Sequence, residues 1–403
     1  MGAALATIAR DVCGSEAVTI DDGRVIGGVD VALTVAPSST SQLAALLRRT
    51  GPDATVVVTG NGTKLHIGLA PERVDLLVST ARLDQVVQHE PGDLVVRVEA
   101  GARLSMLQAV VAPHGQQLAL ESSQAEATIG GVVAANESGP RRHRYGSARD
   151  VVIGATMVLA DGTVARTGGK VVKNVAGYDL GKLMVGSYGT LAILTEVTFR
   201  LHPTHPCRRV VVTPIARSAL AALVARHRTS ALEPTVLELV MDLPGEDGHL
   251  VVGFEGSAPS VEAQAALAVR FDAGARVVEE VPAGLDVVER AVSLRIVVEP
   301  AATIVALDAL ARCGVVGRVC CRVALGIIDA QLEPDALDAV VGLRAELARF
   351  DGSVVVTRLP VARLPGFDVW GPVAAPTLQL MRSVKHRFDP DRRLAPGRFV
   401  GGI

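Results

Sequence analysis

Short valine-rich runs that end in glycine-containing turns recur through the first half of the 403-residue sequence, and they restrict its fold most strongly. Runs of about four to eight β-branched and apolar residues between turn residues predict strands. The segments DATVVVTGNGTKL (53–65), RVDLLVS (73–79) and GDLVVRVEAG (92–101) have this form. Residues 38–50, which begin with capping hydroxyls, and residues 103–115 have helical spacing. The first half therefore predicts a mixed domain of strands and helices.

A different pattern begins after HPTHPC. Between about 207 and 365, strands such as TVLELV, HLVVGFEG and GRVCCRVAL alternate with helical segments. This alternation predicts an α+β layer, with helices on one face of a single sheet. We expect an N-terminal segment (1–27), a first domain (28–204), an α+β domain (205–365) and a C-terminal segment (366–403) that returns to the first domain.

Charge and composition exclude several classes of protein. The formal net charge is −2, so no overall field attracts nucleic acid. No apolar run approaches the roughly 20 residues that span a bilayer, and the N-terminus favours a cytoplasmic protein over an exported one. An odd count of five cysteines argues against a disulfide framework, and we expect no protein-bound metal because no metal-ligand motif is present.

The stretch TGNGTKL directly follows a predicted strand. Gly60 and Gly62 allow positive φ and close approach of the backbone, and Asn61 tolerates the left-handed region. Consecutive N–H groups in such a loop can bind a pyrophosphate, although an ordinary hairpin turn is an alternative interpretation.

A second glycine-rich stretch, ATIGGVVAANESG, precedes the polar segment PRRHRYGSARD. Gly130 and Gly131 remove side chains where a ring or phosphate would contact the backbone, and Asn136 supplies a donor and an acceptor. A tightly packed helix start also explains the glycines.

A third stretch runs from Gly168 to Val197. Lys170 and Lys173 lie beside Asn174, which places them either near an anionic substrate or cofactor, or at a solvated strand edge.

Together these stretches resemble the FAD-binding domain of the vanillyl-alcohol oxidase and p-cresol methylhydroxylase family. The resemblance covers about residues 28–204. It rests on the motifs GNGTK, ATIGG, AAN, YG and KNVAGYDL in this order. It implies a two-subdomain FAD-binding domain of p-cresol methylhydroxylase type with an α+β cap domain. KNVAGYDL and the ending FDPDRRLAPGRF most resemble the FAD-binding subunits of bacterial glycolate oxidases, and also D-lactate dehydrogenases of this type.

The resemblance implies FAD contacts from four parts of the chain. The implied residues are Gly60, Asn61, Gly62, Thr63 and Lys64 at the pyrophosphate, Ala127, Thr128, Ile129, Gly130, Gly131, Ala134 and Asn136 along the ribityl chain and ring, Tyr145 and Gly146 close by, and Ile193 at the adenine end. Arg295 and Lys173 are the candidate catalytic residues, because oxidation of a 2-hydroxy acid needs a cation for its carboxylate.

Two departures from the family affect the expected function. The cap strand GRVCCRVAL carries no histidine, and the closing Asn-Pro-Gly of the family is Ala395, Pro396 and Gly397 here. The resemblance implies a glycolate oxidase-like 2-hydroxy-acid oxidoreductase that passes electrons through FAD to a partner. Both departures instead favour a chain that holds FAD without itself abstracting the substrate proton. Two alternatives stay open: a non-catalytic FAD-holding or electron-relay subunit, and an NADPH-dependent reductase of the UDP-N-acetylenolpyruvoylglucosamine type.

The resemblance also implies partners and a location. A second flavin subunit and an iron–sulfur subunit are the implied partners, with a small 2-hydroxy acid as substrate. The protein is expected in the cytoplasm, either free or peripheral to the inner membrane through its partners. The sequence does not choose the substrate, the electron acceptor, the oligomeric state or the mode of FAD attachment.

Overall fold

The computed structural model describes residues 2–21, 23–169, 178–281, 291–333 and 337–403. The chain divides into two compact units. Unit 1 comprises Met1–Gly139, Gly146–Thr204 and Val373–Ile403, and unit 2 comprises Pro140–Tyr145 and His205–Pro372. Unit 1 therefore contains residues 373–403 of the C-terminal segment, and residues 140–145 group with the second unit.

Unit 1 contains two principal sheets. The four-stranded sheet has the order β1 (Val18–Ile20), β4 (Leu33–Val35), β6 (Leu76–Ser79), β5 (Val56–Thr59). In it β4 and β5 both run parallel to β6. The antiparallel five-stranded sheet has the order β11 (Val164–Gly168), β10 (Val152–Val158), β12 (Ile193–Arg200), β8 (Val95–Glu99), β7 (Val86–Glu90). Two further strand pairs are β2 (Val25–Ile26) with β3 (Val29–Asp30), and β9 (Gln116–Gln117) with β13 (His202–Pro203).

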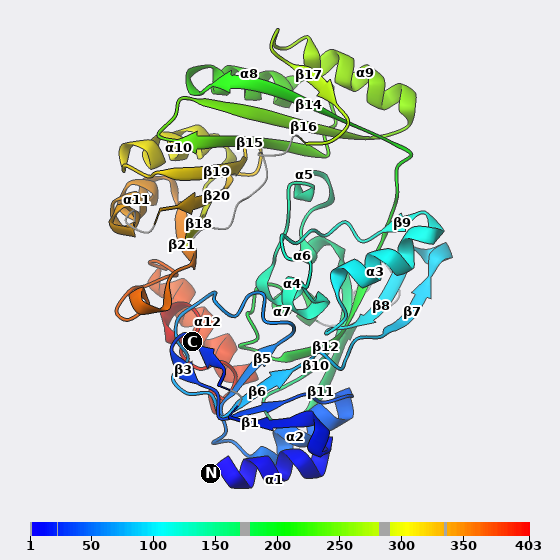
Figure 1. Cartoon of the computed structure of the whole chain (residues 1–403), viewed down its shortest axis with the longest axis vertical. Helices are drawn as coiled ribbons and strands as arrows, with labels where there is room; N and C mark the ends of the chain where they lie inside the picture. The colour runs from blue at the N-terminus through cyan, green and yellow to red at the C-terminus, as the bar shows by residue number, and fades with distance from the viewer. Residues whose placement is uncertain (1, 22, 170–177, 282–290, 334–336) are drawn as a thin grey trace. The chain divides into compact units, whose positions relative to one another are not determined.

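Helices cover both sheets of unit 1. They are α1 (Gly2–Cys13), α2 (Thr40–Thr50), α3 (Leu104–Val111), α4 (Ile129–Ala135), α6 (Ala148–Val151), α7 (Leu180–Met184) and α12 (Ala375–Phe388). In Figure 1, α1 and α2 lie beside the strands of the four-stranded sheet. Their apolar faces share one core with that sheet, and α3, α4 and α6 share another with the five-stranded sheet. Ser39 begins α2 by accepting a hydrogen bond from Gln42 N, as its capping hydroxyl predicts.

Unit 2 is built on one eight-stranded antiparallel sheet. Its order is β17 (Arg276–Val278), β14 (Cys207–Ala216), β16 (Asp247–Gly256), β15 (Val236–Leu243), β19 (Gly317–Arg322), β20 (Ile327–Leu332), β18 (Val292–Val297), β21 (Ser353–Arg358). The helices are α5 (Arg142–Tyr145), α8 (Arg217–Thr229), α9 (Ala258–Val269), α10 (Thr303–Arg312) and α11 (Ala339–Leu347). The last four lie along one side of the sheet (Figure 1), which confirms the predicted α+β layer.

The two faces of this sheet differ in chemistry. On β19, Cys321 pairs with Leu239 and Ile328, whereas the neighbouring Cys320 pairs with Val240 and Asp329. Alternation along a strand places the two cysteines on opposite faces, as the sequence predicts. Burial raises the pKa of Cys320 to about 12, so its thiol stays protonated at neutral pH.

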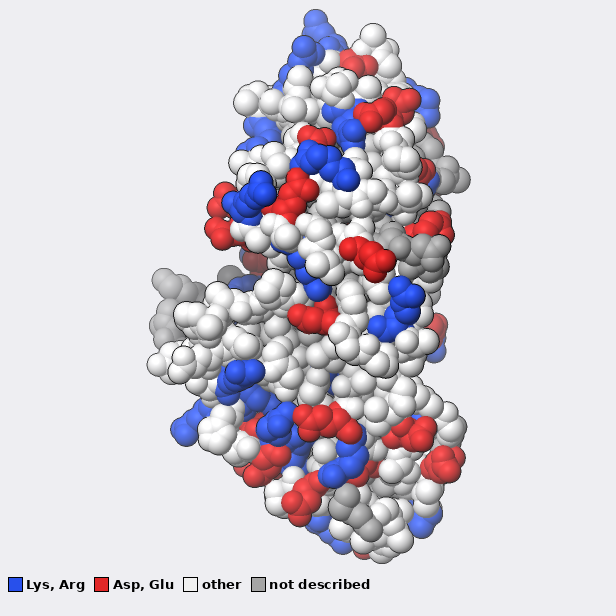
Figure 2. Space-filling model, turned by 90° about the vertical axis from the view of Figure 1, so that its left-hand side faces the viewer, with Lys and Arg blue, Asp and Glu red and all other residues white. Residues whose placement is uncertain are grey.

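Two further findings concern the described residues only. No helix among them is both long enough and apolar enough to cross a bilayer. Nor do their His, Cys, Asp and Glu side chains form a group of three or more that could hold a metal ion. On the face shown in Figure 2, basic and acidic side chains are interspersed, in keeping with the nearly balanced charge.

Candidate functional site

The two glycine-bearing bends lie against each other in unit 1. A methyl group on Gly60 would overlap the side chain of Thr128, so the loop after β5 approaches the start of α4 closely only because residue 60 lacks a side chain. Next to it, Asn61 Nδ2 donates to the backbone oxygen of Glu126 at 2.9 Å. Folding thus joins segments more than 60 residues apart.

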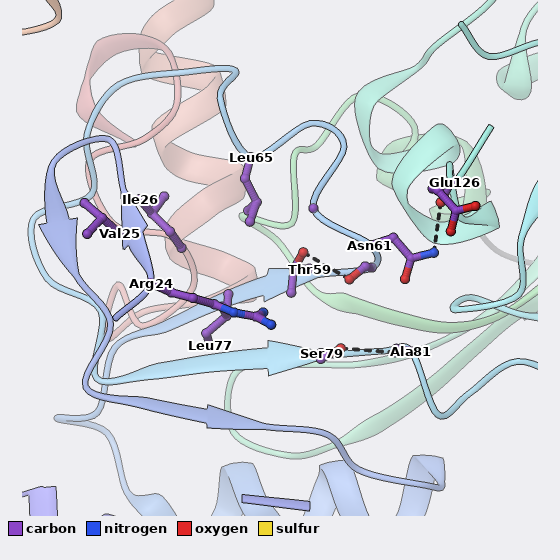
Figure 3. Close-up of a pocket in the computed structure, with 12 residues that line it drawn as sticks. Arg24, Val25, Ile26, Thr59, Asn61, Leu65, Leu77, Ser79, Ala81 and Glu126 are labelled. Atoms are coloured by element: carbon purple, nitrogen blue, oxygen red, sulfur yellow. Dashed lines mark hydrogen bonds between the residues drawn. The ribbon is translucent and has the colours of Figure 1, made fainter. Parts of the chain in front are cut away.

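A cavity of about 580 Å³ opens beside this contact. It lies at the C-terminal ends of the parallel strands β5 and β6, where Thr59 and Ser79 end the two strands (Figure 3). Open sheets with parallel strands commonly bind ligands at this edge. The lining residues are Arg24, Val25, Ile26, Thr59, Gly60, Asn61, Gly62, Leu65, Leu77, Ser79, Ala81 and Glu126.

Gly62 shapes the loop at the cavity. Its φ of +77° lies in the region that favours glycine, and the chain turns there before Lys64. Gly60, Asn61 and Gly62 all line the cavity, whereas Thr63 and Lys64 do not. Lys64 Nζ instead lies 2.8 Å from Glu137 Oε1, with both side chains largely buried.

The two glycines of α4 occupy different surroundings. A methyl group on Gly130 would lie 2.9 Å from Cβ and 3.0 Å from the backbone oxygen of Ala100. Gly130 is therefore explained by tight packing of α4 against the bend after β8. At Gly131 the methyl group would meet only Oγ1 of Thr128, at 3.1 Å, among the described atoms. Thr128 is the N-cap of this helix and accepts a hydrogen bond from Gly131 N.

Asn136 ends α4 in the left-handed conformation, with a φ of 49°. Its Oδ1 is buried and has no hydrogen-bond partner within the described part of the chain. The loop after α7 docks on the same helix end, because Gly186 N donates to Val133 O and Tyr188 N donates to Ala134 O. The second and third stretches singled out in the sequence therefore meet at Asn136.

The remaining implied FAD contacts lie in varied surroundings. Ala127, Ile129 and Ile193 are at most 2% exposed and belong to hydrophobic cores, while Ala134 is partly buried. Tyr145 belongs to unit 2, where its hydroxyl donates to Glu255 Oε2 at 2.9 Å. Burial, followed by this bond to Glu255, raises the pKa of Tyr145. Gly146 has a φ of +77° and begins the turn into α6.

Of the two candidate catalytic residues, Arg295 lies within the described part of the chain. Arg295, on β18 of unit 2, makes a two-point ion pair with Asp329, at 2.7 Å and 3.1 Å. Arg322 Nη1 donates to the same carboxylate at 3.0 Å. Burial alone would raise the pKa of Asp329, but the two guanidinium groups outweigh it and lower that pKa to about 2. Lys173 and Lys170 lie outside the described residues.

Sequence reasoning missed several residues at the cavity. The position of Ser79 could have been predicted from the sequence. Ser79 ends β6 with a hydroxyl group, as Thr59 ends the neighbouring strand β5. The position of Arg24 could not, because only the folded hairpin β2–β3 brings it to a loop that follows residue 59.

Comparison with known proteins finds a family model that matches one segment of the chain. Residues 31–168 match the family model described as FAD binding domain. This segment is an FAD-binding domain. It contains the cavity loop and the whole of α4.

Relatives of the FAD-binding domain carry related names. The chain is 40% identical over 150 residues to the glycolate oxidase subunit GlcE of Escherichia coli, a match that covers 37% of this chain and 42% of the relative. It is 31% identical over 222 residues to a D-lactate dehydrogenase of Archaeoglobus fulgidus, covering 55% and 50%. A D-2-hydroxyglutarate dehydrogenase of Xanthomonas citri pv. viticola is 27% identical over 90% of this chain and 88% of the relative. The matches above 30% identity thus span half or less of these relatives' length.

A solved structure supports the fold as a whole. An alkyldihydroxyacetonephosphate synthase aligns with a TM-score of 0.66 and 16% sequence identity, over 91% of this chain and 76% of the other. The architecture is thus that of the p-cresol methylhydroxylase type, with an FAD-binding domain and an α+β domain.

The geometry of the domain fits FAD. The cavity volume is within the range of roughly 300–1,000 Å³ that is typical of cofactor sites. Gly60 and Gly62 leave bare backbone at the cavity, and the N–H groups of a loop of this kind can bind a phosphate. The buried Oδ1 of Asn136 is an acceptor that a ligand donor can satisfy.

Proposed function

We propose that the chain is an FAD-dependent oxidoreductase that oxidises the CH–OH group of a small 2-hydroxy acid, as one subunit of a glycolate oxidase-like assembly. The observation that carries this proposal is the FAD-binding domain, with its joined glycine bends and adjacent cavity. The names of the relatives, which specify glycolate, D-lactate and D-2-hydroxyglutarate, support the substrate class.

The reaction divides between cofactor and protein. A bound flavin would supply a two-electron acceptor for the hydride of the substrate carbon, and the hydroxyl proton would pass to solvent water. The backbone at Gly60 and Gly62 binds the pyrophosphate. The rest of the dinucleotide is oriented by the implied contacts on and around α4, by Tyr145 and Gly146, and by Ile193. For the substrate, we retain Arg295 and Lys173 as the proposed cations that bind its carboxylate. Asp329 orients the guanidinium of Arg295 through two hydrogen bonds.

Partners and electron transfer extend the proposal. The relatives named as glycolate oxidase subunits support assembly with further subunits. We propose a second flavin subunit and an iron–sulfur subunit as the partners that receive the electrons.

A specific observation favours a second candidate function, that of an FAD-holding relay subunit. β19 carries Cys320 and Cys321 and no histidine, and Arg295 already has a carboxylate partner. In that case a partner subunit would oxidise the substrate, and this chain would transfer electrons.

The decisive experiment is anaerobic mixing of the purified yellow protein with glycolate, D-lactate, D-2-hydroxyglutarate and NADPH in turn. We expect one of the hydroxy acids to bleach the visible flavin absorbance. Arg295→Lys should slow this bleaching about tenfold, because lysine lacks the planar fork that binds a carboxylate. Arg318→Lys is the matched control, since Arg318 makes a similar two-point pair with Asp242 in the same sheet.

Each other outcome has a distinct meaning. Bound flavin that none of the hydroxy acids bleaches would support the relay function instead. Rapid bleaching by NADPH would support the reductase alternative. Protein that binds no FAD would overturn the proposal itself.

A further inference from the structure

One cation at the cavity comes from a segment that neither the family motifs nor the glycine-rich loops include. Arg24 lies immediately before β2, and its backbone oxygen accepts a hydrogen bond from Val31 N at 3.0 Å. Ile26, next along the hairpin, is 3% exposed and packs in a small core with Val57 and Leu77 of the parallel sheet. The hairpin is thus held against the strands whose ends form the cavity.

The turn of this hairpin is docked as well. Gly27 has a φ of +60°, and a methyl group there would lie 2.9 Å from Cα of Ala70. The hairpin therefore also touches the chain that follows the cavity loop. Two anchors, Ile26 and Gly27, fix the main chain on the C-terminal side of Arg24.

The side chain of Arg24 extends into the cavity. Figure 3 shows its guanidinium directed toward Thr59 and Ser79. Arg24, which is exposed, thus shares the lining of the cavity with these two hydroxyl groups and with the backbone of Gly60–Gly62. A guanidinium beside hydroxyls and backbone N–H groups matches the several acceptor oxygens of a diphosphate.

Lys64, the cation of the loop itself, does not line the cavity, whereas Arg24 does. Lys64 pairs with Glu137, whose carboxylate also accepts from Ser122 Oγ at 2.9 Å and from Ser123 N at 3.3 Å. This network ties Lys64 to the segment before α4. Among the described residues that line the cavity, Arg24 carries the positive charge, and Glu126 directs its carboxylate to Arg103 at 2.8 Å.

We propose that Arg24 binds the diphosphate of the dinucleotide, in the role that the motif alone would assign to Lys64. The inference rests on the proposed FAD function, which it deepens by naming the phosphate-binding cation. The ligand class is a nucleoside diphosphate ester. The hairpin β2–β3 is then a part of the cofactor site.

The proposal is tested on the whole chain after its flavin has been removed. The test measures how tightly this protein binds ADP and FAD. We measure ADP by titration calorimetry and FAD by quenching of its fluorescence. Arg24→Gln should weaken both ligands about tenfold or more, the usual size of a lost charge-assisted hydrogen bond. Arg24→Lys should recover part of the loss, and ADP affinity should depend less on salt in Arg24→Gln than in the parent.

Two control variants separate this effect from general charge loss. Arg10→Gln removes an exposed positive charge on α1 of the same unit. The double variant Lys64→Gln/Glu137→Gln removes the ion pair without leaving a lone buried charge. Both should change ADP affinity less than about threefold, within the usual range for charges that do not contact a ligand.

The outcomes distinguish this inference from the proposed function. If the parent binds FAD and Arg24→Gln binds it equally well, Arg24 does not contact the diphosphate and the inference fails. A large loss in the Lys64 double variant alone would return the role to Lys64. If the parent binds ADP through Arg24 but no FAD, the nucleotide site stands and the proposed function fails. Binding of neither ligand overturns both.

Discussion

Adjacent glycines in one short helix serve different purposes. Gly130 lies against Ala100 on the preceding bend, so packing within the protein accounts for it. Gly131 has only the side chain of its own N-cap within reach among the described atoms. The pair GG in the sequence therefore combines a structural glycine with a candidate ligand-facing one, and their neighbours in the sequence do not tell them apart.

This difference predicts opposite results for two substitutions. Gly131→Val should fold with little loss of stability but yield colourless protein, because the side chain occupies space that we assign to the flavin. Gly130→Ala should lower the free energy of unfolding by about 1–3 kcal/mol through overpacking against Ala100. Visible absorbance and thermal melting measure the two effects. Fully yellow Gly131→Val protein would show that this glycine does not face the ring.

Two side chains that the sequence marks as candidate ligand-binding cations form ion pairs within the protein. From the sequence, Lys64 and Arg295 are both predicted to bind an anionic ligand. In the structure Lys64 pairs with Glu137, and Arg295 pairs with Asp329. Their partners lie far along the chain, and no local pattern marks them. The charge available to a ligand is therefore a property of the folded site.

Among the elements, α8 shows how burial controls a titratable group. His227 on this helix is 3% exposed, its ring lies against Phe271 at 5.0 Å, and burial lowers its pKa from 6.5 to about 4. No helix was named over residues 217–229 from the sequence. Its buried face includes Leu220, Leu223 and Val224.

The lowered pKa of His227 predicts a pH dependence of stability. Between about pH 6.5 and pH 4 the unfolded chain binds a proton that the folded chain does not, so stability falls as the pH falls through this window. The loss should reach roughly 3 kcal/mol at about 1.4 kcal/mol per pKa unit. His227→Phe should flatten the curve of unfolding free energy against pH, measured with urea.

An exposed histidine of the same unit provides the control. His205→Phe should leave the pH dependence unchanged, because His205 is exposed. Equal slopes in the parent and in His227→Phe would show that His227 does not titrate as its burial implies.

At the scale of the whole chain, the C-terminal segment completes unit 1. Arg393, which is 3% exposed, donates to the backbone oxygens of Leu47, Ala54 and Ala160. Arg398 donates to those of Leu65 and Ile67, just beyond the cavity loop. Residues at the end of the sequence thus hold the loop and strands of its first quarter.

A buried ion pair anchors this segment. Lys385 Nζ donates to Asp389 Oδ2 at 2.6 Å and to the backbone oxygens of Thr190 and Leu394, both at 2.8 Å. Lys385→Met should destabilise unit 1 by about 3–5 kcal/mol, because it leaves the carboxylate of Asp389 buried without its cation. Urea unfolding measures the change.

The matched control removes an exposed charge from the same helix. Arg387→Met should change stability by less than about 0.5 kcal/mol, since Arg387 is exposed. Equal effects of the two substitutions would show that the ion pair does not anchor the segment.

Local patterns in the sequence were enough to predict much of the architecture. Valine-rich runs between glycine turns predicted β5, β6 and β8, hydroxyl caps predicted α2, and alternating segments predicted most of the second sheet. These features depend on backbone preference and on periodicity within a few residues, so they can be predicted from the sequence alone. Spaced motifs likewise indicated FAD, and the family match over residues 31–168 confirmed it.

Only the tertiary structure decided which groups meet. It brought Gly60 to Thr128, Arg24 to the ends of β5 and β6, and Glu137 to Lys64. Such contacts join residues tens to hundreds of positions apart, and their energies depend on burial and distance rather than on the order of the chain. The motifs thus indicated the ligand, while the fold selected the charges and surfaces that can bind it.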